Sequence, residues 1–177
     1  MILKSPTYRP NTVERVTTSE VFGSAITQYE AKEWCRIDSD QDSSTVLELV
    51  SDMLELYQEM LNLSMFNQTV DVTYSSFGKK IMLPLAPVQS ITSVKTLKDK
   101  ELPYEIIGDT LFMEELSDDG LKVIYKAGFK KLPGGLKLSL KQAILSAYND
   151  REDNVMGGVG RVFDNSRRKA MKYKRWL

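Results

Sequence analysis

The sequence contains no histidine and only one cysteine, Cys35. The lack of histidine removes the commonest general base and a frequent metal ligand, which argues against many enzyme classes. One cysteine cannot form an internal disulfide and is typical of a reducing compartment. No run approaches about 18 consecutive apolar residues, and the N-terminus lacks the charged-then-apolar pattern of a signal peptide. We therefore expect a cytoplasmic protein that neither spans a membrane nor is secreted.

Sequence motifs for catalysis or metal binding are also missing. Asp38, Asp40 and Asp42 alternate as in a calcium loop. A calcium loop also needs a glycine at its sixth position and a glutamate at its twelfth, where this chain has Ser43 and Leu49. Cys35 lies with Ala31 and Trp34 on the apolar face of a short predicted helix, and without any histidine or an obvious cationic pocket it reads as a structural side chain. We expect no catalytic residue, no metal and no cofactor.

Charge is balanced overall but unevenly distributed, with 24 basic and 24 acidic residues. Residues 28–60 contain nine carboxylates against only Lys32 and Arg36, whereas residues 161–177 contain seven basic residues against only Asp164. Between these regions the Gly-Gly-Val-Gly run at 157–160 lacks the Lys-Ser/Thr ending of a phosphate-binding loop. The run therefore favours a linker that precedes a basic C-terminal helix.

Two segments show the spacing of amphipathic helices. From Asp42 to Leu63 the apolar residues recur with helical spacing and polar residues occupy the positions between them. The same spacing returns from 136 to 148. The apolar face of the first segment consists of Val46, Leu49, Val50, Met53, Leu54, Tyr57, Met60 and Leu61. The second consists of Leu136, Leu140, Ala143, Ile144, Ala147 and Tyr148. A shorter helix should begin at the capping box formed by Thr27 and Glu30.

Between these helices, short β-like runs are separated by Gly, Pro and Asp residues. The predicted strands are 69–74, 80–83, 91–97, 104–107, 110–113 and 121–125. Successive strands are close enough to pair as antiparallel hairpins. The sequence therefore predicts an α+β fold: an antiparallel helical core of two long amphipathic helices plus short helices, with an inserted small antiparallel β-sheet.

We expect one domain over residues 1–177. Its predicted parts are an extended arm at 1–26, a helical segment at 27–66, a β insert at 67–129, a helix at 130–153, and a hinge with a basic C-terminal helix at 154–177.

Four stretches resemble the head-tail connector, or adaptor, proteins of long-tailed bacteriophages. They are TQYEAKEWCRID at 27–38, LPLAPVQSITSV at 83–94, VIYKAGF at 123–129 followed by LKQAIL at 140–145, and YKRW at 173–176. The resemblance covers the chain from Thr27 onwards and implies a structural virion protein of the neck, present in the host cytoplasm during assembly. Such proteins form a ring of about twelve subunits beneath the portal. The ring extends the channel through which DNA passes as cargo, and it receives the stopper or tail-completion protein.

Given this resemblance, the basic C-terminal segment is the candidate portal-docking element. Aromatic side chains can anchor such a contact, and the basic ones can speed the encounter with an acidic portal surface or with the acidic region at 28–60 of a neighbouring subunit. The docking residues are Arg167, Arg168, Lys169, Met171, Tyr173, Lys174, Arg175 and Trp176. The hinge residues are Gly157, Gly158 and Gly160.

Three other interpretations stay open at this point. The C-terminal segment could pack only on its own subunit. The basic aromatic helix could instead bind nucleic acid, through phosphate contacts and base stacking, although the acidic region at 28–60 would repel DNA. An enzyme would have to use carboxylate pairs such as Asp118 and Asp119, which read as turn residues.

Overall fold

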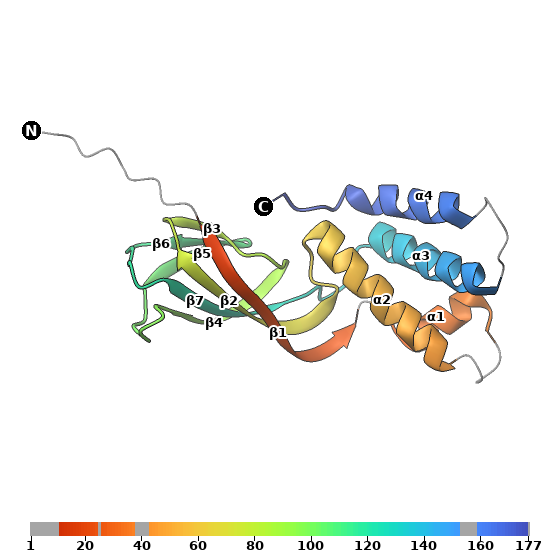
Figure 1. The fold of residues 1–177 in the computed structure, drawn as a ribbon, viewed down its shortest axis with the longest axis horizontal. Coiled ribbons are helices and arrows are strands. Elements are labelled where there is room, and N and C mark those ends of the chain that lie inside the picture. Colours follow the sequence, from red (N-terminus) through yellow and green to blue (C-terminus); the bar gives the residue numbers. More distant parts are fainter. Residues whose placement is uncertain (1–10, 25, 38–42, 153–158, 177) are drawn as a thin grey trace, which may run out of the picture. The chain divides into compact units, whose positions relative to one another are not determined.

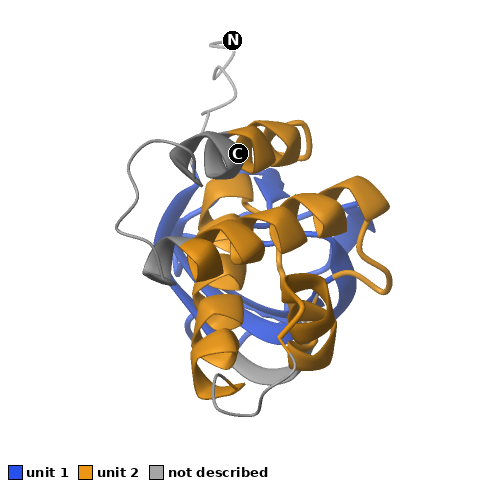
Figure 2. Cartoon of the chain, turned by 90° about the vertical axis from the view of Figure 1, so that its right-hand side faces the viewer, with its two compact units in different colours: residues 1–22, 67–128 blue, residues 23–66, 129–177 orange. Residues whose placement is uncertain are grey.

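The computed structural model describes residues 11–24, 26–37, 43–152 and 159–176. The chain divides into two compact units, coloured separately in Figure 2. Residues 1–22 and 67–128 form the β unit, and residues 23–66 and 129–177 form the helical unit. No helix in the described part of the chain is long and apolar enough to cross a membrane.

The described strands form two antiparallel sheets in the β unit (Figure 1). The larger sheet has the order β1-β2-β7-β4, and the smaller has the order β3-β6-β5. The strands are β1 (Thr12–Ser24), β2 (Phe66–Ser76), β3 (Lys80–Met82), β4 (Val88–Lys95), β5 (Tyr104–Ile107), β6 (Thr110–Met113) and β7 (Leu121–Ala127). All six predicted strands are confirmed, and those at 104–107 and 110–113 have the predicted bounds.

Both sheets contribute to one hydrophobic core. In β2 and β7 every second residue is buried, because successive side chains of a strand point to opposite faces. The larger sheet supplies Val72 and Tyr125 to this core, while the smaller sheet supplies Ile81 and Leu111. The β unit therefore buries its own apolar faces by packing one sheet on the other.

Four described helices make up the helical unit. They are α1 (Gln28–Cys35), α2 (Ser43–Leu61), α3 (Gly134–Glu152) and α4 (Val159–Met171). The capping box of α1 is confirmed: the Glu30 amide donates to the Thr27 hydroxyl and the Thr27 amide donates to the Glu30 carboxylate, each at 3.2 Å. Arg36, in the left-handed conformation at φ 57°, ends the helix.

Helices α2 and α3 bury the apolar faces that their spacing predicted. Five residues of the α2 face are buried, and on α3 Leu136, Leu140, Ala143 and Ile144 are almost fully buried. The Tyr57 hydroxyl of α2 lies 3.1 Å from the Ser139 hydroxyl of α3. A polar contact thus fixes how these two apolar faces meet.

The predicted fold class is nevertheless wrong. The chain is a mixed α and β protein with four helices of 8 to 19 residues and two antiparallel sheets among its described residues, not a core of two long helices with one inserted sheet. The N-terminal segment also contributes β1 to the larger sheet. Among successive strands of the predicted β insert, only β5 and β6 pair with each other. Periodicity identified the strands, but their partners depend on contacts that are distant in sequence.

A candidate docking surface on the helical unit

Helix α4 is held firmly within the helical unit. It begins at Val159, five residues before the predicted start at Asp164. Ser166 and Ala170 are fully buried, and they lie four residues apart on one face of the helix. The Tyr57 hydroxyl contacts the Ser166 hydroxyl at 3.4 Å, and the Ser139 hydroxyl donates to the Ser166 carbonyl. One face of α4, carrying Ser166 and Ala170, is therefore part of the core, whereas Arg167, Arg168 and Lys169 between them are exposed.

The residues after α4 turn back onto the end of α2. The Tyr173 amide donates to the Ala170 carbonyl at 2.9 Å, which closes the last helical turn. The Arg175 amide then donates to the Leu61 carbonyl at 2.9 Å, and the Asn62 side-chain amide donates to the Arg175 carbonyl at 3.0 Å. Two hydrogen bonds to the end of α2 thus hold the backbone just before Trp176.

The structure brings the predicted docking residues to one end of the helical unit. Among them, those that are exposed are Arg167, Arg168, Lys169, Met171 and Trp176, and those that are half-buried are Tyr173, Lys174 and Arg175. Trp176 leaves 75% of its surface exposed, and the Lys174 ammonium lies 4.8 Å from the centre of its ring. Gly160 lies in the first turn of α4, whereas Gly157 and Gly158 are outside the described residues.

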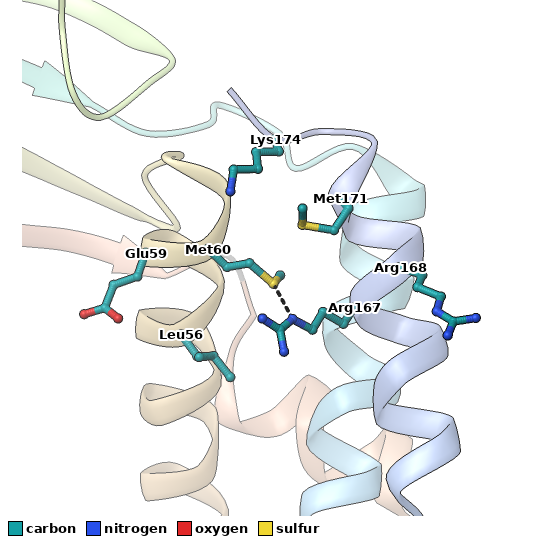
Figure 3. A pocket seen from close by; sticks show the side chains of 7 residues that line it. All are labelled: Leu56, Glu59, Met60, Arg167, Arg168, Met171 and Lys174. Atoms are coloured by element: carbon teal, nitrogen blue, oxygen red, sulfur yellow. Dashed lines mark hydrogen bonds between the residues drawn. The ribbon is translucent and has the colours of Figure 1, made fainter. Parts of the chain in front are cut away.

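A groove of about 540 Å³ runs between α2 and α4 (Figure 3). Its lining consists of Leu56, Glu59, Met60, Arg167, Arg168, Met171 and Lys174. The Arg167 Nε donates to the Met60 sulfur at 3.2 Å across the groove. Sequence reasoning missed the α2 residues of this surface. Leu56 carried a signal in the sequence, since it is an apolar residue that lies outside the predicted apolar face; in the structure 40% of it is exposed.

The groove is rich in basic side chains for which the described residues provide no salt-bridge partner. In the described part of the chain, no salt bridge involves Arg167, Arg168 or Lys169, although Lys169 donates to the Gln142 side chain at 3.3 Å. Three basic residues and one carboxylate line the groove together with Leu56 and two methionines. Such a surface suits a partner that offers both carboxylates and apolar side chains.

No feature of the described residues provides a metal centre or a reactive thiol. No group of three or more His, Cys, Asp or Glu side chains there is placed to hold a metal ion. Cys35 is half-buried, and this burial raises the pKa of its thiol. A raised thiol pKa reduces the thiolate fraction and with it the reactivity.

Comparison with known proteins identifies the family. The family model of head completion proteins matches residues 24–163. The chain belongs to the head completion protein family. This match confirms the resemblance to head-tail connector proteins that the four sequence stretches carried. The matched range ends before Arg167, so it includes none of the eight predicted docking residues.

Solved structures that have low sequence identity to this chain share its fold. A chain of "Neck of empty GTA particle computed with C6 symmetry" has a TM-score of 0.68 at 14% identity, covering 86% of this chain and 94% of that one. A chain of "Virion of native gene transfer agent (GTA) particle" has a TM-score of 0.66 at 15% identity, with 85% and 93% covered. One from "Neck of native GTA particle computed with C12 symmetry" gives 0.64 at 14%, with 86% and 94% covered. The search of curated proteins found no match.

Proposed function

We propose that this chain is a structural protein of the neck of a phage-like particle. It forms a ring beneath the portal, surrounds the channel that DNA crosses, and receives the stopper or tail-completion protein. The observation that carries the proposal is the family match over residues 24–163. The shared fold with chains of gene transfer agent necks, whose titles name six-fold and twelve-fold symmetry, also supports a ring.

The partner on the head side is the portal protein, and the basic end of the helical unit is the surface that meets it. Trp176 supports this role because it is largely exposed and tryptophan is enriched among the residues that dominate binding at protein interfaces. The ordered backbone just before Trp176 also lowers the entropy lost on binding. The exposed arginines and lysines would attract an acidic portal surface.

Portal binding tests this role of Trp176. Trp176→Ala should weaken binding of the full-length chain to purified portal about 30-fold or more, the effect of losing an interface anchor. Isothermal calorimetry measures the dissociation constant, and Trp34→Ala on α1, where 38% of the side chain is exposed, is the matched control. Equal affinities of Trp176→Ala and the wild type would refute docking through this residue.

A short truncation separates docking from folding. Removing residues 174–177 leaves the buried Ser166 and Ala170 in place, whereas removing residues from 164 onwards would delete part of the core. Particles made with the shorter deletion should lack bound tails when viewed by electron microscopy. Normal tailed particles would exclude this segment from the assembly role.

Nucleic-acid binding remains the competing function, because Trp176 beside Lys174 could stack on a base. Under our proposal the isolated protein binds single-stranded DNA only weakly at physiological salt. Quenching of tryptophan fluorescence by oligonucleotides at submicromolar concentration, in the wild type but not in Trp176→Ala, would favour the competing function.

The proposed role is structural, so we also predict that the chain has no catalytic turnover of its own. Phosphatase, nuclease and protease assays of the purified protein should give background rates. An activity that disappears on substitution of one carboxylate would contradict this prediction.

A further inference from the structure

An acidic stripe runs along the outer face of α2. It consists of Glu48, Asp52, Glu55 and Glu59, which are all exposed and make no hydrogen bond or salt bridge with described residues. Their spacing of four, three and four residues places them in one line of about 16 Å on the side opposite the buried face. Like charges at these spacings destabilise a helix. The stripe therefore weakens α2 unless opposite charge is brought to it.

The opposite charge is found at the C-terminal end of α4 and in the residue that follows it. Arg168 and Lys172 are exposed, lie four residues apart, and have no described carboxylate within salt-bridge distance. We call these two residues the basic edge. In Figure 3, Glu59 on α2 and Arg168 on α4 lie at opposite rims of the groove, and their charged ends point apart. No salt bridge among the described residues joins the acidic stripe to the basic edge, so the two surfaces do not neutralise each other within the described chain.

Apolar side chains lie beside both charged surfaces. Leu47 and Leu56 flank the stripe and are 55% and 40% exposed, and Met171 beside the basic edge is 36% exposed. Charges steer two surfaces together, while burial of apolar area holds them. The stripe and the edge therefore each combine charged groups with exposed apolar area, as protein interfaces do.

We propose that the acidic stripe on α2 of one copy binds the basic edge at the end of α4 of a neighbouring copy. The partner is a second copy of this chain because the chain itself carries both complementary surfaces with matching spacing. The two surfaces are different parts of the chain, so the contact is head-to-tail, and repetition of such a contact produces a ring or a filament. The inference rests on the proposed ring and names the residues that join its subunits.

Charge exchange between two variants tests the contact. The stripe variant is Asp52→Lys with Glu55→Lys, and the edge variant is Arg168→Glu with Lys172→Glu. Each is made in the full-length chain, and self-association is measured by sedimentation velocity from about 1 μM to about 1 mM in low salt. Each variant alone should self-associate about 30-fold or more weakly than the wild type. An equimolar mixture should regain affinity to within about tenfold, because each variant then supplies the charge that the other lacks.

Matched controls place the same charge changes elsewhere. Glu105→Lys with Glu114→Lys corresponds to the stripe variant, and Lys130→Glu with Lys131→Glu corresponds to the edge variant; all four residues are exposed. The controls should leave wild-type self-association nearly unchanged. Raising the salt to about 0.5 M should weaken the wild-type contact.

Several results would overturn the inference. One is a mixture that associates no more tightly than either variant alone, and another is control variants that self-associate as weakly as the stripe and edge variants. A wild-type chain that stays monomeric up to about 1 mM, or a mixture that forms only one-to-one pairs, would overturn it as well. Portal binding of the same proteins separates the two proposals. Portal binding with failed charge exchange refutes only the subunit contact. Successful charge exchange with no portal binding and no incorporation into particles refutes only the neck function.

Discussion

Tyr57 joins three helices through one hydroxyl group. From α2 it reaches the Ser139 carbonyl of α3 at 3.3 Å, the Ser139 hydroxyl at 3.1 Å and the Ser166 hydroxyl of α4 at 3.4 Å. All three residues are fully buried. Because buried polar groups without partners are unfavourable, this network specifies how the three helices meet.

Removing that hydroxyl should destabilise the protein. We expect Tyr57→Phe to lower the free energy of unfolding by about 1–2 kcal/mol, since it leaves buried serine groups with fewer partners. Urea unfolding followed by circular dichroism measures the loss. Tyr104→Phe, at a tyrosine that is 37% exposed, should change stability by less than about 0.5 kcal/mol. Similar effects at both positions would show that the network contributes little.

Two adjacent glycines at the start of α3 report on the position of Tyr173. A methyl group at Gly134 would contact nothing within 4 Å, whereas one at Gly135 would lie 2.7 Å from the Tyr173 hydroxyl oxygen. Gly134→Ala should therefore stabilise the chain by about 0.4–1 kcal/mol, and Gly135→Ala should give a clearly lower melting temperature than Gly134→Ala. In a Tyr173→Phe background the difference should shrink. A difference that persists there would mean that Tyr173 does not lie against α3.

At the scale of elements, α1 is tied to α3 by a salt bridge. The Glu30 carboxylate, which also caps α1, accepts a hydrogen bond from the Lys137 ammonium. This bond holds the Glu30 pKa below its ordinary value of 4.5, with the Thr27 amide adding to the effect and burial opposing it. Because the pKa is lowered in the folded state, the contribution to stability is present above pH 4.5 and is lost as the pH falls through the lower folded value.

Glu30→Gln should remove this pH-dependent contribution. The amide oxygen can still accept the Thr27 hydrogen bond, but the charge that attracts Lys137 is gone. At pH 7 we expect a loss below about 1 kcal/mol, because both side chains are about one-third exposed. The wild type and the variant should converge in stability as the pH drops from 5 to 3 in urea titrations. Glu55→Gln on the unpaired stripe is the control, and an equal pH effect there would argue against the salt bridge.

Elements could be predicted from this sequence more easily than the partners of those elements. Regular spacing located α2, α3 and the strands from β2 to β7, but not β1, because a buried face imposes its period on the chain. It did not reveal that β7 pairs with both β2 and β4, since strands far apart in sequence carry no local signal of their pairing. For the site, the basic and aromatic composition marked the C-terminal end. The contact of Met60 with Arg167 depends on the packing of two distant helices, which composition does not encode.

At the scale of the whole molecule, the chain leaves the helical unit and returns to it at neighbouring points. Gln68 near the start of β2 is paired with Ala127 at the end of β7. Residues 67–128 therefore start and finish side by side in one sheet, and they carry a hydrophobic core of their own. The two units have the organisation expected of parts that fold independently.

Excision of the β unit tests that independence. A chain without residues 1–22, in which a short Gly-Ser linker replaces residues 67–128, should keep its helical circular dichroism and melt cooperatively. The expectation follows from the separate buried core of the helical unit, which includes Leu54 and Leu140. A non-cooperative melt or a loss of helical signal, compared with the full-length chain under the same conditions, would show that the helices need the β unit.

The pairing of Gln68 with Ala127 also bears on how such a gene can change. An in-frame exchange between two crossovers, near codons 67 and 128, would replace most of the β unit with a foreign one and leave the sequence of the helices unchanged. β1 is an edge strand whose pairing with β2 uses main-chain groups, so it can also pair with a replacement for β2 that has a different sequence. Recombination between related genomes could thus give one helical framework many different β surfaces.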